Sequence, residues 1–317
     1  MKVVRSPYTD GLGHHPLFRL DARRVTWVSS PRQLWSHSLR IVAGIHAVSF
    51  LVWGLLTLLL VSNSPSIDPD KMLIASINSL YILGLLTILA DAILDFICLQ
   101  TALKTIYGEV IAGRWDLLRL TALNEWGIVR AKYAGARLRV WRATIVVAGM
   151  RLATLMIGIL ILMVLLYVLF GENSFIESLI DGFRNDPLSA LLGVVTTSLI
   201  ALVYAVEPFW RMQAMTALGM VLSAQFHSAA MGMLAAVGVM VAVWLLQIVI
   251  VIALVLGLGM GLGVLLAPLL VGEDSFLAST IYLLLACGIT TLTIYGFYAL
   301  LQTWSLRRVV RRIDKAN

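Results

Sequence analysis

The stretch EVIAGRWDLLRLTALNEWGIVRAKYAGARLRVWR, residues 109–142, is a long polar interruption between two very apolar segments. It carries acidic, basic and amide side chains, whereas the segments on either side of it are predominantly apolar. Apolar runs of about 20 residues or more are long enough to cross a bilayer as helices. We therefore interpret this stretch as part of an arm, residues 99–142, that joins two transmembrane helices outside the lipid.

The composition of the whole chain also indicates a membrane protein. Of its 317 residues, 60% are hydrophobic and only 13% are charged, and the mean hydropathy is +0.92. Soluble domains are about half apolar and one-quarter charged. The net charge of +7 would favour nucleic-acid binding in a soluble protein, but basic loops are expected in membrane proteins. We expect an all-α polytopic membrane protein embedded in the lipid bilayer, with no nucleic-acid partner.

The order of the apolar runs predicts six spans with a segment at each end. Residues 1–40 mix Trp and Leu with Arg, which is typical of an amphipathic lead-in at the membrane interface. Ser30 and Pro31 have the pattern of a helix start, and this helix is expected to run into the first span. Residues 207–228 are expected to form a second polar connection, and residues 305–317 a basic tail. The spans are expected at residues 41–61, 74–98, 143–170, 188–206, 229–256 and 277–304.

The apolar run over residues 229–270 is too long for a single span. As one helix it would measure about 60 Å, twice the thickness of the hydrocarbon core. Glycine destabilises helices and permits tight turns, and four glycines alternate with other residues over 257–263. We expect a broken or re-entrant segment to Pro268, before the sixth span, and such backbone must be buried by protein.

The basic residues are distributed unequally between the two sides of the predicted bundle. Segments 1–40, 99–142, 207–228 and 305–317 carry 21 Lys and Arg residues, whereas the other connections carry only Lys71 and Arg184. Basic loops remain in the cytoplasm by the positive-inside rule. Both termini are therefore expected in the cytoplasm.

Three charged residues fall inside the expected spans. Asp91 and Asp95 are four residues apart and share a helix face, and Arg151 lies at a similar depth in the next span. Charges inside a membrane are costly and usually paired, so we expect an Asp91–Arg151 pair, with His46 as a candidate third member. We favour a structural role for this pair over a proton or substrate relay, because one pair near the interface does not form a chain across the membrane.

The sequence contains few features that point to catalysis or metal binding. Cys98 and Cys287 both lie in apolar runs and are expected to pack as small hydrophobic residues. His14 and His15 are adjacent, which does not make a metal-ligand set. No phosphate-binding G-x-x-x-x-G-K-[ST] loop is present, so the chain is not expected to bind ATP in that way. We expect no enzyme activity and no cofactor in this chain.

The arm itself is expected to contain three pieces. Its first part continues the second span, Gly113 breaks that helix, and residues 114–120 form a short amphipathic helix. Asn124 is a candidate N-cap for a third helix that leads into the third span. The short helix could dock a partner, since both of its ends are tied to spans that can tilt. The alternative is a basic loop that contacts anionic lipid, and the residues alone do not separate these two interpretations.

The arm resembles the loop after the second span in permease subunits of the ABC-2 type transporter family. Those loops share an acidic residue, a Gly, a small polar or aromatic residue, a second acidic residue and Leu-Leu. Thr-Pro-Leu follows, and a Lys comes about ten residues further on. The sequence HHPLFRLDARR and residues 216–230 are similar to the start and the second connection of the family. Arg114 and Ala122 depart from the family's Thr and Pro. The matching positions are Glu109, Gly113, Trp115, Asp116, Leu117, Leu118, Thr121, Leu123 and Lys132.

The resemblance implies a permease subunit in a prokaryotic plasma membrane, with an amphipathic elbow helix ahead of span one. It would pair with a second permease half, identical or not, and with two cytoplasmic ATPase subunits that bind ATP and Mg²⁺. The residues 114–120 would be the coupling helix, and export or flipping of an apolar or amphipathic substrate would follow. The alternative is a non-transporting subunit that scaffolds a larger membrane complex. The implied ATPase contacts are Glu109, Gly113, Arg114, Trp115, Asp116, Leu117, Leu118, Thr121 and Lys132.

Overall fold

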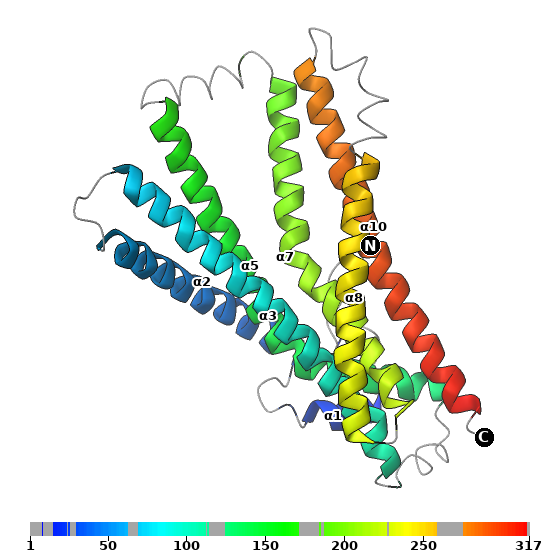
Figure 1. Cartoon of the computed structure of the whole chain (residues 1–317). Helices are drawn as coiled ribbons and strands as arrows, with labels where there is room; N and C mark the ends of the chain where they lie inside the picture. Colours follow the sequence, from blue (N-terminus) through cyan, green and yellow to red (C-terminus); the bar gives the residue numbers. More distant parts are fainter. Residues whose placement is uncertain are drawn as a thin grey trace.

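The described part of the chain is entirely helical (Figure 1). The computed structural model describes residues 8, 15–23, 25, 30–62, 69–111, 113, 124–170, 184, 187–226, 228–258 and 275–315. No strand occurs among these residues. The helices are α1 (Pro16–Arg23), α2 (Pro31–Ser62), α3 (Pro69–Ile111), α5 (Glu125–Phe170), α7 (Pro187–Ser223), α8 (Ala229–Gly257) and α10 (Ser275–Lys315).

Six of these helices are long and apolar enough to cross a membrane, and they identify a multi-pass membrane protein. The candidate spans lie within α2, α3, α5, α7, α8 and α10. Two helix starts follow the expected sequence signals. The backbone N–H of Gln33 donates to Ser30 Oγ at 3.3 Å, and the N–H of Trp126 donates to Asn124 Oδ1 at 3.2 Å. These side chains cap α2 and α5, because they satisfy first-turn N–H groups that have no helical partner.

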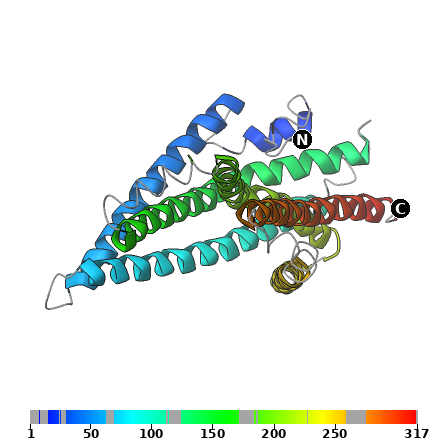
Figure 2. The ribbon, with the colours of Figure 1, turned by 90° about the horizontal axis from the view of Figure 1, so that it is seen from above.

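The helices form a fan (Figure 1). Helices α2, α3, α5, α7 and α10 are spread apart at one end, here called the splayed end, and come together at the other, the converged end, beside α1. Helix α7 packs against α3, α5 and α10, while α5 packs against α1, α2 and α3. Seen from above, α2 and α8 lie on opposite sides of the central helices (Figure 2).

The hydrophobic core lies at the converged end and is centred on Trp141. This side chain is fully buried, its ring packs on Trp35 and Phe209 at centroid distances of 6.0 and 5.4 Å, and its Nε1 donates to Ser38 Oγ at 3.1 Å. Met212 and Met215 of α7 join the same core. Towards the splayed end, by contrast, large aliphatic side chains such as Leu55 and Leu58 are more than half exposed. That surface suits contact with lipid chains.

Several helices are longer than the spans expected from the sequence. Helices α3 and α5 have 43 and 46 residues, which correspond to about 65 and 69 Å at 1.5 Å per residue, against a hydrocarbon core of about 30 Å. They therefore extend well beyond the bilayer. The expected break after the fifth span falls partly outside the described residues. Helix α8 ends at Gly257, and nothing is described from residue 259 to 274.

The structure has helix over most of residues 207–228, where the sequence predicts a polar connection. Helix α7 continues through this segment to Ser223, and residues 208–223 are buried. The segment is buried because most of its residues are small or apolar and pack on α3 and α5. Its charged residues are accommodated by ion pairs to other helices, described next.

Candidate functional site

A cluster of charged side chains occupies the point where the helices come together. It consists of Asp91 and Asp95 of α3, Arg151 of α5, and Glu207 and Arg211 of α7. We refer to these five residues as the charged cluster. Their side chains are at most 12% exposed, so each charge depends on its partners within the protein rather than on water.

Arg151 is the link between α3 and α7. Its Nη2 and Nε donate to the two carboxylate oxygens of Asp91 at 2.7 and 3.2 Å, which is the strong bidentate geometry of a guanidinium and a carboxylate. Its Nη1 lies 2.7 Å from Glu207 Oε2. One cation therefore holds two carboxylates from different helices.

Pro208 explains why α7 offers an additional acceptor at this place. Proline within a helix has no N–H and leaves the carbonyl four residues earlier without its helical donor. That carbonyl belongs to Tyr204, and it accepts a hydrogen bond from Arg151 Nη1 at 3.0 Å. The side chain of Arg151 thus replaces the donor that the proline removes.

Arg211 connects the cluster to α8. Its Nε lies 3.1 Å from Asp95 Oδ1 and its Nη1 lies 3.5 Å from Asp91 Oδ2. Its Nη2 donates to Gln247 Oε1 at 2.9 Å, and its guanidinium lies over the ring of Trp244. Trp244 Nε1 also donates to Asp95 Oδ2 at 2.8 Å. Asp95 is therefore held from α7 and α8, although it lies on α3.

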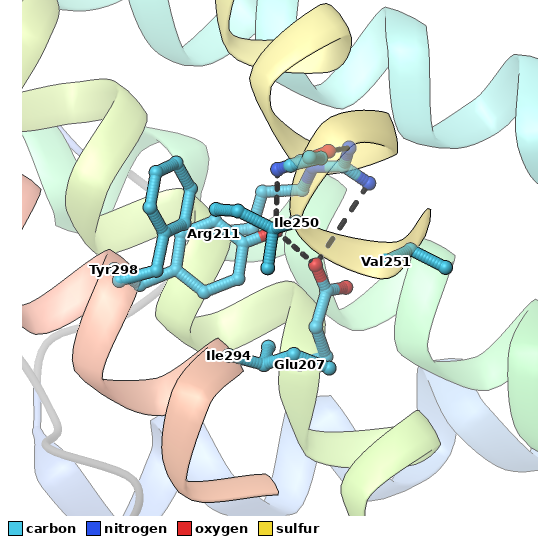
Figure 3. Close-up of a pocket in the computed structure, with 8 residues that line it drawn as sticks. Glu207, Arg211, Ile250, Val251, Ile294 and Tyr298 are labelled. Atoms are coloured by element: carbon cyan, nitrogen blue, oxygen red, sulfur yellow. Dashed lines mark hydrogen bonds and ion pairs between the residues drawn. The ribbon is translucent and has the colours of Figure 1, made fainter. Parts of the chain in front are cut away.

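Glu207 is shared between the cluster and α10. Its Oε1 accepts a hydrogen bond from the hydroxyl of Tyr298, which accepts in turn from Gln247 Nε2 at 2.8 Å. Figure 3 shows the carboxylate of Glu207 between the Tyr298 hydroxyl and Arg211, where the three side chains line a small pocket. This pocket has a volume of about 190 Å³, and Gln247 and apolar side chains of α8 and α10 complete its lining. Five helices thus contribute to one polar network.

Glu207 also lies at the end of a larger groove between α5, α7 and α10, which we call the α7–α10 groove. Its volume is about 390 Å³, within the range of roughly 300–1,000 Å³ that is usual for small-molecule sites. Apart from Arg151 and Glu207, its lining is largely apolar. The other lining residues are Ile200, Val203, Tyr204, Leu283, Ala286, Cys287, Thr290, Thr291 and Ile294.

The charged cluster lies at the same depth on three helices. Asp91, Arg151 and Glu207 are 22, 19 and 20 residues from the splayed ends of α3, α5 and α7. These separations correspond to about 30 Å along each helix, the thickness of one hydrocarbon core. A hydrocarbon core that begins at the splayed ends would therefore end at the cluster, with exposed aliphatic side chains on one side of it and the buried core on the other.

Of the charged residues expected to pair inside the spans, Asp91 and Arg151 do so. Asp95 and His46 have other partners. Asp91 and Arg151 form a direct pair, whereas Asp95 pairs with Arg211. His46 forms its hydrogen bond with the carbonyl of Val42 in its own helix.

Glu207, Arg211 and Tyr298 were missed as members of this site. The sequence pattern alone places Glu207 and Arg211 in a polar connection between spans, although they are four residues apart with a proline between them. That spacing, in a segment otherwise apolar enough to continue a span, was the signal for a paired helical site.

A second group of ion pairs joins α1, α3 and α5 where the arm leaves α3 and enters α5. Lys132 of α5 lies 2.8 Å from Glu109 of α3 and 3.4 Å from Asp21 of α1. Asp21 also accepts from Arg139 at 3.1 Å, and a Cβ at Gly135 would lie 3.1 Å from the Asp21 side chain. Helix α1 is therefore docked closely on α5, directly beside the junction of α3 and α5.

The expected partner contacts lie partly outside the described residues. Glu109 and Lys132 are in contact, and Gly113 has a φ of 63°, a left-handed conformation that suits a glycine just after a helix. It follows the end of α3, as the sequence predicted. The remaining expected contacts are not described, namely Arg114, Trp115, Asp116, Leu117, Leu118 and Thr121.

Replacement of Asp21 by Asn is expected to loosen α1. The change removes a charged acceptor that faces Lys132 and Arg139, and hydrogen bonds to charged groups contribute about 1.5–3 kcal/mol. Trypsin should then cleave after Arg23 or Arg24 roughly tenfold faster or more. Arg19→Gln on the exposed face of α1 serves as the control, and an unchanged rate for Asp21→Asn would show that these ion pairs do not hold α1.

Comparison with known proteins does not assign this chain to a family. No protein-family model, curated protein or solved structure matches this chain. Within the described ranges, no group of three or more His, Cys, Asp or Glu side chains is placed to hold a metal ion. Burial lowers the pKa of His15 below its usual value, and its neighbour His14 lies outside the described residues.

Proposed function

We propose that this protein is the membrane permease subunit of an ABC-type transporter. A separate cytoplasmic ATPase would dock on the arm and drive export or flipping of an apolar or amphipathic substrate. The chain would work with a second permease half and with ATPase subunits that supply the ATP and Mg²⁺ site. Following the resemblance, we assign the chain to the plasma membrane of a prokaryotic cell. We place the converged end in its cytoplasm, because the basic residues described on α1, at the start of α5 and at the end of α10 belong to that end.

The contact between Glu109 and Lys132 is the observation that carries the proposal. These residues are 23 positions apart and match the first acidic residue and the later Lys of the family pattern. Their partly buried ion pair joins the last turn of α3 to the first turns of α5. A force applied to the segment between them would therefore be transmitted to both helices together.

The length and packing of the helices support the same mechanism. Helices α3 and α5 are continuous and longer than a bilayer is thick. Helix α7 packs against α3, α5 and α10. Because tightly packed helices move as units, a tilt applied at the converged end would change the separation of the helices at the splayed end. This arrangement suits alternating access, in which a small movement outside the membrane opens or closes a path within it.

A double substitution within residues 114–120 of the arm, which lie outside the described residues, tests the proposal. Trp115→Ala combined with Asp116→Lys removes the aromatic side chain and reverses the charge where the ATPase would bind. The full-length variant, purified gently from its native host, should retain less than about one-tenth of the co-purifying ATPase, a loss of about 1.4 kcal/mol or more in binding. Its thermal stability should be unchanged.

Arg311→Gln with Arg312→Gln is the matched control, because both side chains are exposed on α10 and belong to the same side of the membrane. This control should keep the ATPase. Co-purification of the unaltered chain with an unrelated membrane complex, and with no ATP-binding subunit, would refute the proposal. That result would favour a non-transporting scaffold subunit.

A further inference from the structure

The charged cluster carries an excess of negative charge. Three carboxylates, those of Asp91, Asp95 and Glu207, face two guanidinium groups, those of Arg151 and Arg211. Fully ionised, the cluster has a net charge of −1. The other side chains described in contact with it are uncharged, namely Tyr204, Trp244, Gln247 and Tyr298.

An uncompensated charge at this depth is costly. Transferring a charged side chain from water into the protein interior costs free energy, unless an opposite charge lies nearby. The cluster therefore requires one further positive charge. A proton on one of the carboxylates meets this requirement in the absence of a ligand, and a cation that enters the site can replace it.

Glu207 is the carboxylate that a cation can reach. It lines both the small Tyr298 pocket and the α7–α10 groove, whereas the Asp95 side chain is fully buried. A carboxylate has lone pairs for about four hydrogen bonds, so Glu207 has acceptor capacity beyond Tyr298 and Arg151. Its position makes it the contact point between the cluster and any molecule in the groove.

The direction of the groove indicates the shape of that molecule. From Glu207 the groove passes Val203 and Ile200 on α7 and reaches Leu283 on α10. Both helices begin at the splayed end (Figure 1), so the apolar part of the groove points from the membrane boundary into the hydrocarbon region. An amphiphile within a lipid leaflet has this orientation, with its charge at the boundary and its apolar body inside.

We propose that the α7–α10 groove binds an amphiphilic monovalent cation, with its charged group at Glu207 and its apolar body between α7 and α10. As the substrate of a transporter, such a cation would enter from the adjacent lipid leaflet. That last step rests on the proposed function, whereas binding itself depends only on this chain.

Cys287 provides a direct test, because it lines the groove and is partly exposed while Cys98 is buried. The full-length chain in phosphatidylcholine nanodiscs is labelled with N-ethylmaleimide in the presence of tetraphenylphosphonium, a permanently charged apolar cation. Labelling of Cys287 should slow at least fivefold. The anion tetraphenylborate and the neutral triphenylphosphine oxide should give no protection, although both enter the bilayer.

Two variants locate the binding site. Glu207→Gln should weaken equilibrium binding of tetraphenylphosphonium at least tenfold. Ala286→Trp, which fills the groove and leaves the charged cluster intact, should do the same, whereas Leu292→Trp on the exposed face of α10 should not. If Glu207→Gln does not fold, the affinity of the Ala286→Trp variant for tetraphenylphosphonium tests whether the cation binds in the groove.

Equal protection by tetraphenylborate or by the neutral compound would overturn the proposal, as would unchanged affinity in the Ala286 variant. These measurements contain no ATPase. If no cation binds, the proposed ATPase contact is not tested by that result. If no ATPase co-purifies, the proposed cation site is not tested by that result.

Discussion

Arg151→Leu is expected to destabilise the protein by about 3–5 kcal/mol, the usual effect of removing one partner from a buried ion pair. The Arg151 side chain is only 7% exposed. Its loss leaves Arg211 as the one guanidinium of the charged cluster facing three carboxylates. It also leaves the Tyr204 carbonyl without its donor. Equilibrium unfolding in detergent measures the change.

Arg142→Leu is the matched control, because Arg142 lies on the same helix and is exposed. It should change the free energy of unfolding by no more than about 0.5 kcal/mol. Wild-type stability of Arg151→Leu with lost transport would contradict a structural role for the cluster. That outcome would assign Arg151 to a proton or substrate relay.

Gly219→Val is expected to disrupt the contact between α3 and α7. A Cβ at this position would lie 2.6 Å from Ala102 Cβ and 2.8 Å from the carbonyl oxygen of Leu99. Neither atom belongs to a flexible side chain, so the two helices must separate. Overpacking of a dense core costs about 1–3 kcal/mol and occasionally more, and we expect the upper end of that range.

The control for this substitution is Gly238→Ala on α8, where no atom lies within 4 Å of the added Cβ. Alanine favours helix by about 1 kcal/mol over glycine, so this control should be neutral or stabilising. A Gly219→Val protein with unchanged thermal unfolding would show that α3 and α7 are not packed as described.

Much of the helical layout could be predicted from local signals. Apolar runs of bilayer length mark the six candidate spans, and the caps at Ser30 and Asn124 mark two helix starts. These features depend on residues close together in the chain. The pairing of Asp91 with Arg151 was expected from matched depth alone, since a buried charge requires a partner.

The rest of the site depends on contacts between distant residues. Glu207 and Arg211 were placed in a connection because charged residues usually end a span. In the structure α7 continues past them, because Glu207 pairs with Arg151 and Arg211 pairs with Asp91 and Asp95 on the neighbouring helices. Tyr298, 91 residues from Glu207, carries no local signal of its role. The close approach at Gly219 depends likewise on Leu99 and Ala102, which lie on another helix.

The most direct test of the account is to identify what contacts residues 114–120 of the arm in the cell. A photo-crosslinking amino acid introduced at Trp115, in the full-length chain in its native host, would be activated and its adducts identified by mass spectrometry. The account predicts an adduct with a cytoplasmic subunit that carries a G-x-x-x-x-G-K-[ST] loop. Adducts only with lipid, or with a membrane protein that belongs to no ATPase complex, would contradict it.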